Sequence, residues 1–203
     1  GSYALTALLR LLDIVESRAI PTAAVECRVQ PRMLINPDFV DRHAATPEKL
    51  LMLVMHELHH VLLGHTTMFS RSTVIDNFVF DAVINGLLCR MFEEPQYTSF
   101  FTDYYSATFP ECLLRPPASF PGRYVVPEEI QQLSDPRTRA AVVAVHQALY
   151  SDAGASYDEV RNLLLTVLGA DGHMEPSFSL LGDHSENGSA DGGLDERSPV
   201  LFD

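Results

Sequence analysis

The chain has 203 residues, of which 46% are apolar, and its formal net charge is −13. This apolar fraction predicts a folded globular protein and excludes a largely disordered one. The charge argues against nucleic acid as a main partner, because proteins that bind phosphates present an excess of lysine and arginine. Residues 171–203 hold eight acidic residues and one arginine, so we expect a domain over 1–170 and an acidic flexible tail or linker over 171–203.

The cysteines and the apolar runs indicate the compartment. Cys27, Cys89 and Cys112 are odd in number and form no CxxC pair, which disfavours a disulfide framework or a cysteine-rich zinc site. No secretory signal or membrane-spanning run is visible in the sequence. We therefore expect a cytoplasmic protein that does not enter a membrane.

The N-terminal part predicts one helix and a small sheet. Apolar residues over 3–18 recur at helical spacing, which predicts a helix. Residues 22–29 alternate between apolar and polar, and residues 32–40 follow, so both predict short strands.

The central part predicts two buried helices. Thr46 and Pro47 are typical of a helix start, and the apolar run that follows should end near Leu63, with Gly64 as the C-terminal cap. A second apolar stretch predicts a helix over about 74–92.

The remainder of the body is mixed. Residues 93–125 hold five prolines and eight Phe or Tyr residues without a steady period, which predicts a long irregular segment, either a cover over a site or a structural wrap. Two helices should close the body, one over about 136–151 and one from Ser156, where Ser156 and Glu159 form a capping-box pattern. The expected fold class is α+β and mainly helical, with a small N-terminal sheet.

The helix predicted after Thr46 contains an HExxH pattern formed by His56, Glu57 and His60. Positions four apart lie on one face of a helix, so the two imidazoles can hold one zinc ion at about 2.0–2.1 Å. Glu57 then flanks the metal and can accept a proton from the water that the metal activates. This pattern predicts a zinc-dependent peptidase in which Glu57 is the general base.

The third metal ligand is expected from the second buried helix. Asn77, Asp81 and Asn85 recur there every four residues, and Asp81 is the only anion among them. Because a buried carboxylate needs a cation, Asp81 is the predicted ligand. The two asparagines would orient the ligands or bond the neighbouring backbone. Asp76 is a weaker rival, since it lies near the helix start, where it can act as a cap.

Four other histidines have different expected roles. His59 points partly away from the metal face and should pack or support it. His65 is nine residues after His56 and would be the third ligand, in place of Asp81, only if the chain turned at Gly64. His146 should pack within its helix, and His184 should lie in the solvated tail, although it could also approach the site.

The two motifs together resemble a known family. "MHELHHVLLGH" followed by "NFVFDAVINGLL" is similar to the metallopeptidase-like domain of bacterial proteins that carry a von Willebrand A-like domain downstream. The resemblance covers residues 45–90 and implies a zincin-like fold, a zinc-dependent peptidase and a genomic association with MoxR-type AAA+ ATPases. No von Willebrand A-like domain follows residue 203 in the sequence, so we expect either an excised domain or a protein that lacks the von Willebrand A-like domain.

Three functional hypotheses remain open at this point. The first is a zinc peptidase acting on proteins or peptides, in which one of Tyr97, Tyr104, Tyr105 and Tyr124 helps to stabilise the oxyanion. The second is a non-catalytic, metal-stabilised interaction module that works with an AAA+ ATPase or a scaffold. The third is a latent peptidase whose cleft is covered by residues 93–125 until a partner moves them.

Overall fold

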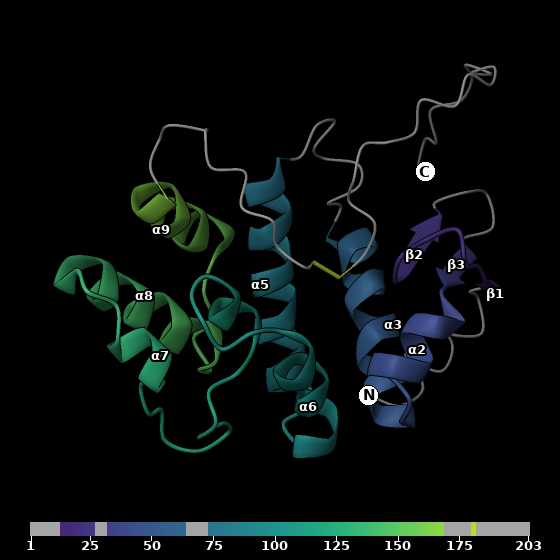
Figure 1. Ribbon diagram of the computed structural model, residues 1–203, viewed down its shortest axis with the longest axis horizontal. Helices are drawn as coiled ribbons and strands as arrows, with labels where there is room; N and C mark the ends of the chain where they lie inside the picture. The colour runs from purple at the N-terminus through teal and green to yellow at the C-terminus, as the bar shows by residue number, and fades with distance from the viewer. Residues whose placement is uncertain (1–12, 27–31, 64–72, 169–179, 182–203) are drawn as a thin grey trace, which may run out of the picture.

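A small three-stranded sheet opens the described part of the protein (Figure 1). The computed structural model describes residues 13–26, 32–63, 73–168 and 180–181. The strands are β1 (Asp13–Glu16), β2 (Ala23–Glu26) and β3 (Arg32–Ile35), in the order β1-β3-β2. The central strand β3 pairs parallel with β1 and antiparallel with β2.

Strand β1 corrects the helix predicted over residues 3–18, of which 3–12 lie outside the described residues. Ile14 is paired with Met33, and Val15 lies opposite Leu34. Ile14 and Val15 are β-branched, and such residues are stiff at the first side-chain torsion and fit a pleated surface. The short apolar run was compatible with a helix, and pairing with a strand that follows later in the chain decided its conformation.

The strand predicted over residues 32–40 is also wrong beyond its first half. Helix α2 (Pro37–His43) begins directly after β3. The side-chain oxygen of Asn36 accepts a hydrogen bond from the backbone N–H of Asp38 at 2.9 Å. Asn36 is therefore an N-cap, and the fixed φ of Pro37 suits the first helical position.

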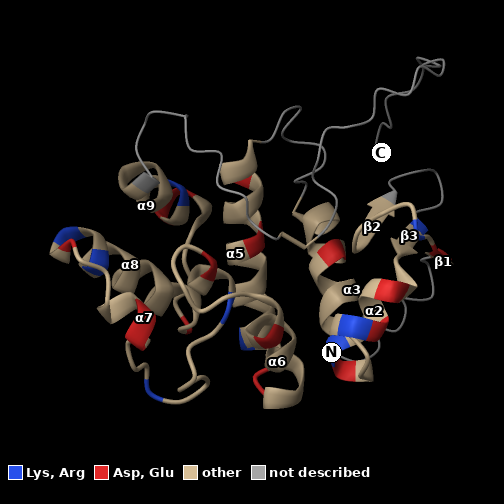
Figure 2. Ribbon diagram, viewed as in Figure 1, with Lys and Arg blue, Asp and Glu red and all other residues tan. Residues whose placement is uncertain are grey.

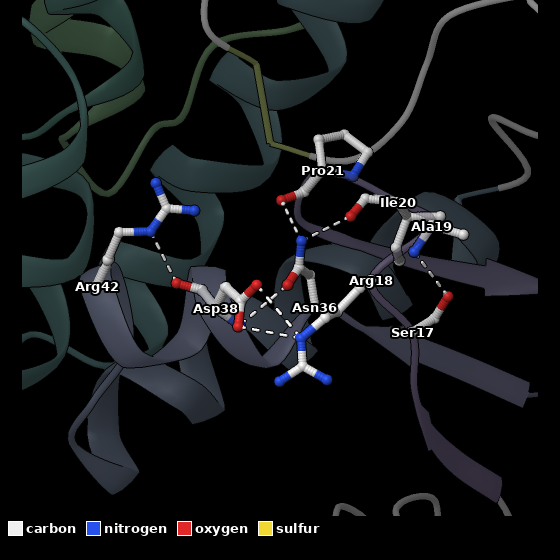
Figure 3. Close-up of polar contacts among 8 residues, drawn as sticks. All are labelled: Ser17, Arg18, Ala19, Ile20, Pro21, Asn36, Asp38 and Arg42. Carbon is white, nitrogen blue, oxygen red and sulfur yellow. Dashed lines mark hydrogen bonds and ion pairs between the residues drawn. The ribbon is translucent and has the colours of Figure 1, made fainter.

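Asn36 also holds the sheet against this helix (Figure 3). Its side-chain nitrogen donates to the carbonyl oxygens of Ile20 and Pro21 at 2.8 and 3.3 Å. Nearby, the Arg18 guanidinium lies 3.2 Å from the Asp38 carboxylate. The turn that follows β1 is thus tied to the start of α2.

Helix α3 (Pro47–Leu62) is the buried helix predicted from the apolar run. The Thr46 side chain accepts from the backbone N–H of Lys49 at 3.3 Å, so the predicted N-cap is confirmed. Residues 52–60 are all buried, because the sheet, α6 and α5 pack around this helix. The cap predicted at Gly64 lies outside the described residues.

Helix α5 (Val74–Met91) is the second predicted buried helix. Its start is a capping box between Thr73 and Asp76. Near its middle, a Cβ on Gly86 would lie only 2.7 Å from the carbonyl oxygen of Leu149. Glycine at this position allows the end of α8 to approach α5 closely.

Two helices correct the prediction that residues 93–125 are irregular throughout. Helix α6 (Pro95–Tyr104) packs against α3 and α5, and the short 3-10 helix η1 (Glu111–Leu114) follows. Phe100 and Phe101 in α6 are fully buried. The aromatic residues of this segment therefore contribute to the core. Helix α6 has only ten residues, and the mixture of proline and aromatic residues around it gives no clear helical period in the sequence.

The last three helices form the other side of the body (Figure 1). They are α7 (Glu128–Gln131), α8 (Pro136–Leu149) and α9 (Tyr157–Leu168). The predicted capping box is present, since Ser156 and Glu159 exchange backbone-to-side-chain hydrogen bonds at 2.7 and 3.3 Å. The expected α+β class, mainly helical with a small sheet, is confirmed. Within the described ranges, no helix combines the length and the apolar character needed to cross a bilayer.

Leu180 and Leu181 are the described residues of the predicted tail. Leu181 is fully buried and belongs to the hydrophobic core. Its backbone N–H donates to the phenol oxygen of Tyr105 at 3.3 Å. The tail over 171–203 stays a prediction as a whole, but at Leu181 the chain packs into the body.

Candidate metal site

Three side chains converge between α3 and α5. The Nε2 atoms of His56 and His60 lie 3.1 Å apart. The Oδ1 atom of Asp81 lies 3.2 Å from Nε2 of His60 and 3.6 Å from Nε2 of His56. All three residues are buried, and one ligand atom from each lies within 4.8 Å of the others. The structure therefore brings together the three predicted ligands in a group that could bind a metal ion.

The spacing of these atoms fits a small tetrahedral cation. Ligands at about 2.0–2.1 Å from a zinc ion in tetrahedral geometry are separated from one another by about 3.3 Å. The observed separations of 3.1, 3.2 and 3.6 Å bracket that value. This close arrangement of two imidazole nitrogens and a carboxylate oxygen is favourable when the three atoms share a cation, either a proton or a metal ion.

Asn85 fixes which nitrogen of His56 faces the group. Its Nδ2 donates to the carbonyl oxygen of Leu114 at 3.0 Å, so its Oδ1 must be the acceptor on the other side. That oxygen lies 2.8 Å from Nδ1 of His56, which therefore carries the proton. Nε2 is left with a lone pair directed at His60 and Asp81. The predicted orienting role of Asn85 agrees with this contact.

The two helices bring no basic side chain to this group. In Figure 2 the basic residues of α3 and α5 lie toward helix ends. Lys49, near the start of α3, lies 2.7 Å from the Asp103 carboxylate. Arg90, in the last turn of α5, donates to the carbonyl oxygen of Leu149. The cation that these helices offer Asp81 is thus a protonated histidine or a metal ion held with the histidines.

Comparison with known proteins adds no family to this geometry. No family model matches the chain, and no curated protein or solved structure matches it either. The resemblance to the metallopeptidase-like domain stays a prediction, and the site is interpreted from its own residues.

Glu57 belongs to the same buried run of α3 as the two histidines, and its exposed fraction is 4%. It follows His56 directly, so it lies about 100° further around the helix. Burying a carboxylate in an apolar helix is costly unless charge or hydrogen bonding compensates. The structure thus places the predicted general base in the same buried part of α3 as the two histidines.

His59 uses one ring nitrogen in a hydrogen bond within α3. Its Nδ1 donates to the carbonyl oxygen of Met55 at 2.7 Å. Burial lowers the pKa of His59, and the neighbouring His56 lowers it further, while the Met55 bond raises it in part. The prediction that His59 packs or supports, and does not bind the metal, agrees with this contact.

His146 and two of the four candidate tyrosines lie in contacts of their own. The Tyr124 hydroxyl donates to Nδ1 of His146 at 2.9 Å, and Nε2 donates to the carbonyl oxygen of Arg115 at 3.2 Å. Burial lowers the pKa of His146 to about 4. The Tyr97 ring packs against Phe92 at 5.3 Å. His146 is thus the packing residue that the sequence predicted.

Two of the candidate tyrosines, Tyr104 and Tyr105, are affected by the charge of Asp81, and Tyr105 is the more deeply buried of the two. Burial raises its pKa well above the usual range, and the charge of Asp81 and the neighbouring Tyr104 raise it further. Hydrogen bonds from the Leu181 backbone and the Asn85 side chain lower the pKa of Tyr105 only in part. The phenol therefore keeps its proton near neutral pH. The sequence offered four tyrosines without a means of choosing among them.

Asp76, the rival ligand, is part of a different contact. It accepts from the Tyr157 hydroxyl at 2.6 Å and from Nε of Arg161 at 3.1 Å, in addition to its cap with Thr73. Burial raises the pKa of Asp76, but these hydrogen bonds, led by that of Tyr157, outweigh burial and lower it to about 2. Asp76 ties α5 to α9 and does not join the metal group.

The remaining candidates are placed as follows. Asn77 is buried in α5. His65 and His184 lie outside the described residues. Sequence reasoning missed the carbonyl oxygen of Leu114, which orients Asn85, because a backbone acceptor from a distant segment leaves no signal in residue types.

Proposed function

We propose that the protein is a zinc-dependent peptidase with a zincin-like domain that hydrolyses amide bonds in proteins or peptides. His56, His60 and Asp81 would hold the zinc ion, and Glu57 would be the general base. The observation that supports this most is the spacing of the three ligand atoms, which matches one face of a zinc tetrahedron. The HExxH pattern and the resemblance to the metallopeptidase-like family point to the same chemistry.

Each residue then has a defined task. A zinc ion in the site would supply Lewis-acid chemistry, polarising the peptide carbonyl and making water more acidic. Glu57 takes a proton from the attacking water as the new bond to the carbonyl carbon forms. It then delivers that proton to the amide nitrogen as the C–N bond breaks, which leaves a carboxylate and an amine.

Asn85 and Tyr105 assist from the second helix and from the end of α6. Asn85 keeps the proton of His56 on Nδ1, so that Nε2 stays available as a ligand. Tyr105 keeps its proton because of burial and the nearby Asp81, and it can donate a hydrogen bond to the developing oxyanion. Among the four candidate tyrosines, its coupling to both Asp81 and Asn85 favours it for this role.

The decisive experiment compares wild type with Glu57→Gln. Zinc content is measured by atomic emission, and cleavage is measured against a mixed peptide library by mass spectrometry. We expect both proteins to hold one zinc ion and the variant to cleave about 10²–10⁴-fold more slowly, the usual contribution of general acid–base catalysis. Cleavage by Glu57→Gln at the wild-type rate would exclude the mechanism.

A second candidate is favoured by the burial of the group. His56 and Asp81 are fully buried and His60 is 4% exposed, whereas a catalytic zinc site usually keeps one position open. In that case the metal would stabilise an interaction module that works with an AAA+ ATPase or a scaffold. X-ray absorption on the zinc-loaded protein distinguishes the two, because a structural site has four protein ligands and a catalytic site has three and a water.

A further inference from the structure

Leu180 and Leu181 lie close to the candidate site although they come long after it in the chain. Figure 1 draws this short yellow segment between α3 and α5. Leu181 is fully buried among core residues. Its backbone N–H donates to the phenol oxygen of Tyr105 at 3.3 Å, a contact that spans 76 positions in sequence.

Tyr105 connects this segment to the metal group. It is the C-cap of α6, the helix that packs against both α3 and α5. Helices α3 and α5 carry His56, His60 and Asp81, so α6 brings Tyr105 to the two elements that build the metal group. Leu181 is thus hydrogen-bonded to a residue at the end of a helix that packs against both of these elements.

Extended peptides are bound by two kinds of contact, and Leu181 makes both. Main-chain hydrogen bonds supply affinity, and pockets that receive individual side chains supply specificity. The N–H of Leu181 makes a main-chain hydrogen bond to the protein, and its side chain is enclosed in an apolar environment. A free peptide with a leucine at the same position could make the same two contacts.

We propose that Leu181 fills a leucine-accepting peptide subsite beside the metal group, so that Leu180–Leu181 is an internal ligand that competes with peptides in solution. As a peptide-binding site it stands on the contacts of Leu181 alone. As the subsite of a peptidase it rests on the function proposed above.

The internal ligand should weaken binding of any peptide that needs this subsite. A tethered segment acts at an effective concentration of roughly millimolar, so it competes well even when its intrinsic affinity is modest. If it is docked in about nine molecules of ten, the apparent affinity for an external peptide falls about tenfold.

The test uses the full chain and a fluorescein-labelled peptide with the sequence of residues 177–185, SFSLLGDHS. Both the reference protein and the Leu181→Ala variant carry Glu57→Gln, so that bound peptide is not cleaved. Fluorescence anisotropy should show at least about tenfold tighter binding to Leu181→Ala. A peptide in which the second leucine is replaced by alanine should bind neither protein.

Leu164→Ala is the matched control, because Leu164 is another fully buried core leucine, in α9. Thermal melting should show that both alanine variants fold with reduced stability, and only Leu181→Ala should gain peptide affinity. Equal binding to the two variants, or to neither, overturns the proposal and makes Leu181 an ordinary core residue.

A second measurement uses the chain with Leu181 intact, so it does not depend on how well Leu181→Ala folds. Millimolar unlabelled peptide should displace the segment and speed hydrogen exchange at the Leu181 amide, and unchanged exchange overturns the proposal. Peptide binding together with no Glu57-dependent cleavage of the mixed peptide library would support the subsite and overturn the peptidase. Cleavage by wild type with no gain of binding in Leu181→Ala would exclude the subsite alone.

Discussion

Buried histidines occur in two regions of this protein, and their surroundings differ. His146, on α8, has both ring nitrogens in hydrogen bonds, to a tyrosine hydroxyl and to a backbone carbonyl. His56 and His60, on α3, direct Nε2 atoms at each other and at the carboxylate of Asp81. The first arrangement is complete with neutral groups, whereas the second brings three potential metal ligands together.

The difference shows how burial of a histidine should be interpreted. Burial, with a smaller effect of the Arg115 charge, lowers the pKa of His146 to about 4 although its backbone hydrogen bonds raise it, so His146 stays neutral and serves packing. At the other site a buried anion faces two imidazoles, and the charge of Asp81 favours a bound cation. The neighbours of the ring nitrogens, more than burial, indicate which histidines could bind a metal ion.

The contrast between His146 and the group of His56, His60 and Asp81 requires that this group binds a metal ion, and variants of its ligands test this most directly. His60→Gln or Asp81→Asn should weaken zinc binding by more than about 100-fold, because even loss of an outer partner costs about 10–100-fold. Competition with a calibrated zinc chelator measures this affinity. His59→Gln changes the neighbouring buried histidine and should retain zinc; equal loss in all three variants would show that the measurement reports unfolding.

The His146 region should respond to pH. Its pKa is about 4 in the folded protein against 6.5 for the free side chain, so its neutral form stabilises the fold fully above pH 6.5. That contribution, up to about 3 kcal/mol at 1.36 kcal/mol per pH unit, is lost as the pH falls toward 4. Urea unfolding of wild type and His146→Gln from pH 7 to 4 measures it. The variant should lose less stability across this range, and parallel curves would contradict the assigned environment.

Asn85 gives His56 an oxygen acceptor for one ring nitrogen, as the Arg115 carbonyl does for His146. The remaining ring nitrogen of His56 is therefore the one that faces the metal group. Asn85→Ala should lower zinc affinity by about 10–100-fold, since Nδ1 of His56 loses its acceptor. Asn77→Ala removes a buried amide from the same helix and is the matched control. Chelator competition on both variants gives the result, and equal affinities would exclude an orienting role.

Two aspartates of α5 differ in the same way, because Asp76 has hydrogen-bond partners of its own and Asp81 belongs to the metal group. The expected effect of replacing Asp76 on stability is smaller. Asp76 has its pKa lowered to about 2 by Tyr157, Thr73 and Arg161 against the effect of burial. Its charged form stabilises the fold above pH 4, and this stabilisation is lost between pH 4 and 2. Asp76→Asn should cost about 1 kcal/mol at pH 7, because Arg161 is partly exposed and the interaction is screened. Urea unfolding measures this loss of stability. Atomic emission should show unchanged zinc content in the variant, and loss of zinc would contradict the separation of Asp76 from the site.

Several features of the fold could be predicted from the sequence because they depend on local interactions. Thr46 and Pro47 start α3, and Ser156 and Glu159 start α9, through contacts within one helical turn. The strand at β1 could not be predicted, because Ile14 and Val15 form it by pairing with β3. Helix α6 was missed because its aromatic residues are ordered by the core that they fill.

The sequence alone determined the pair His56 and His60, the carboxylate of Glu57 and the one anion, Asp81, on a polar stripe of the next buried helix. Fixed helical geometry makes such spacing meaningful before any fold is known. Only the tertiary structure decided the rest. It grouped Asp81, and not Asp76, with the two histidines, gave Asn85 its backbone partner at Leu114 and placed Leu181 beside Tyr105. These choices depend on contacts between segments far apart in the chain, and residue types at local spacing do not encode such contacts.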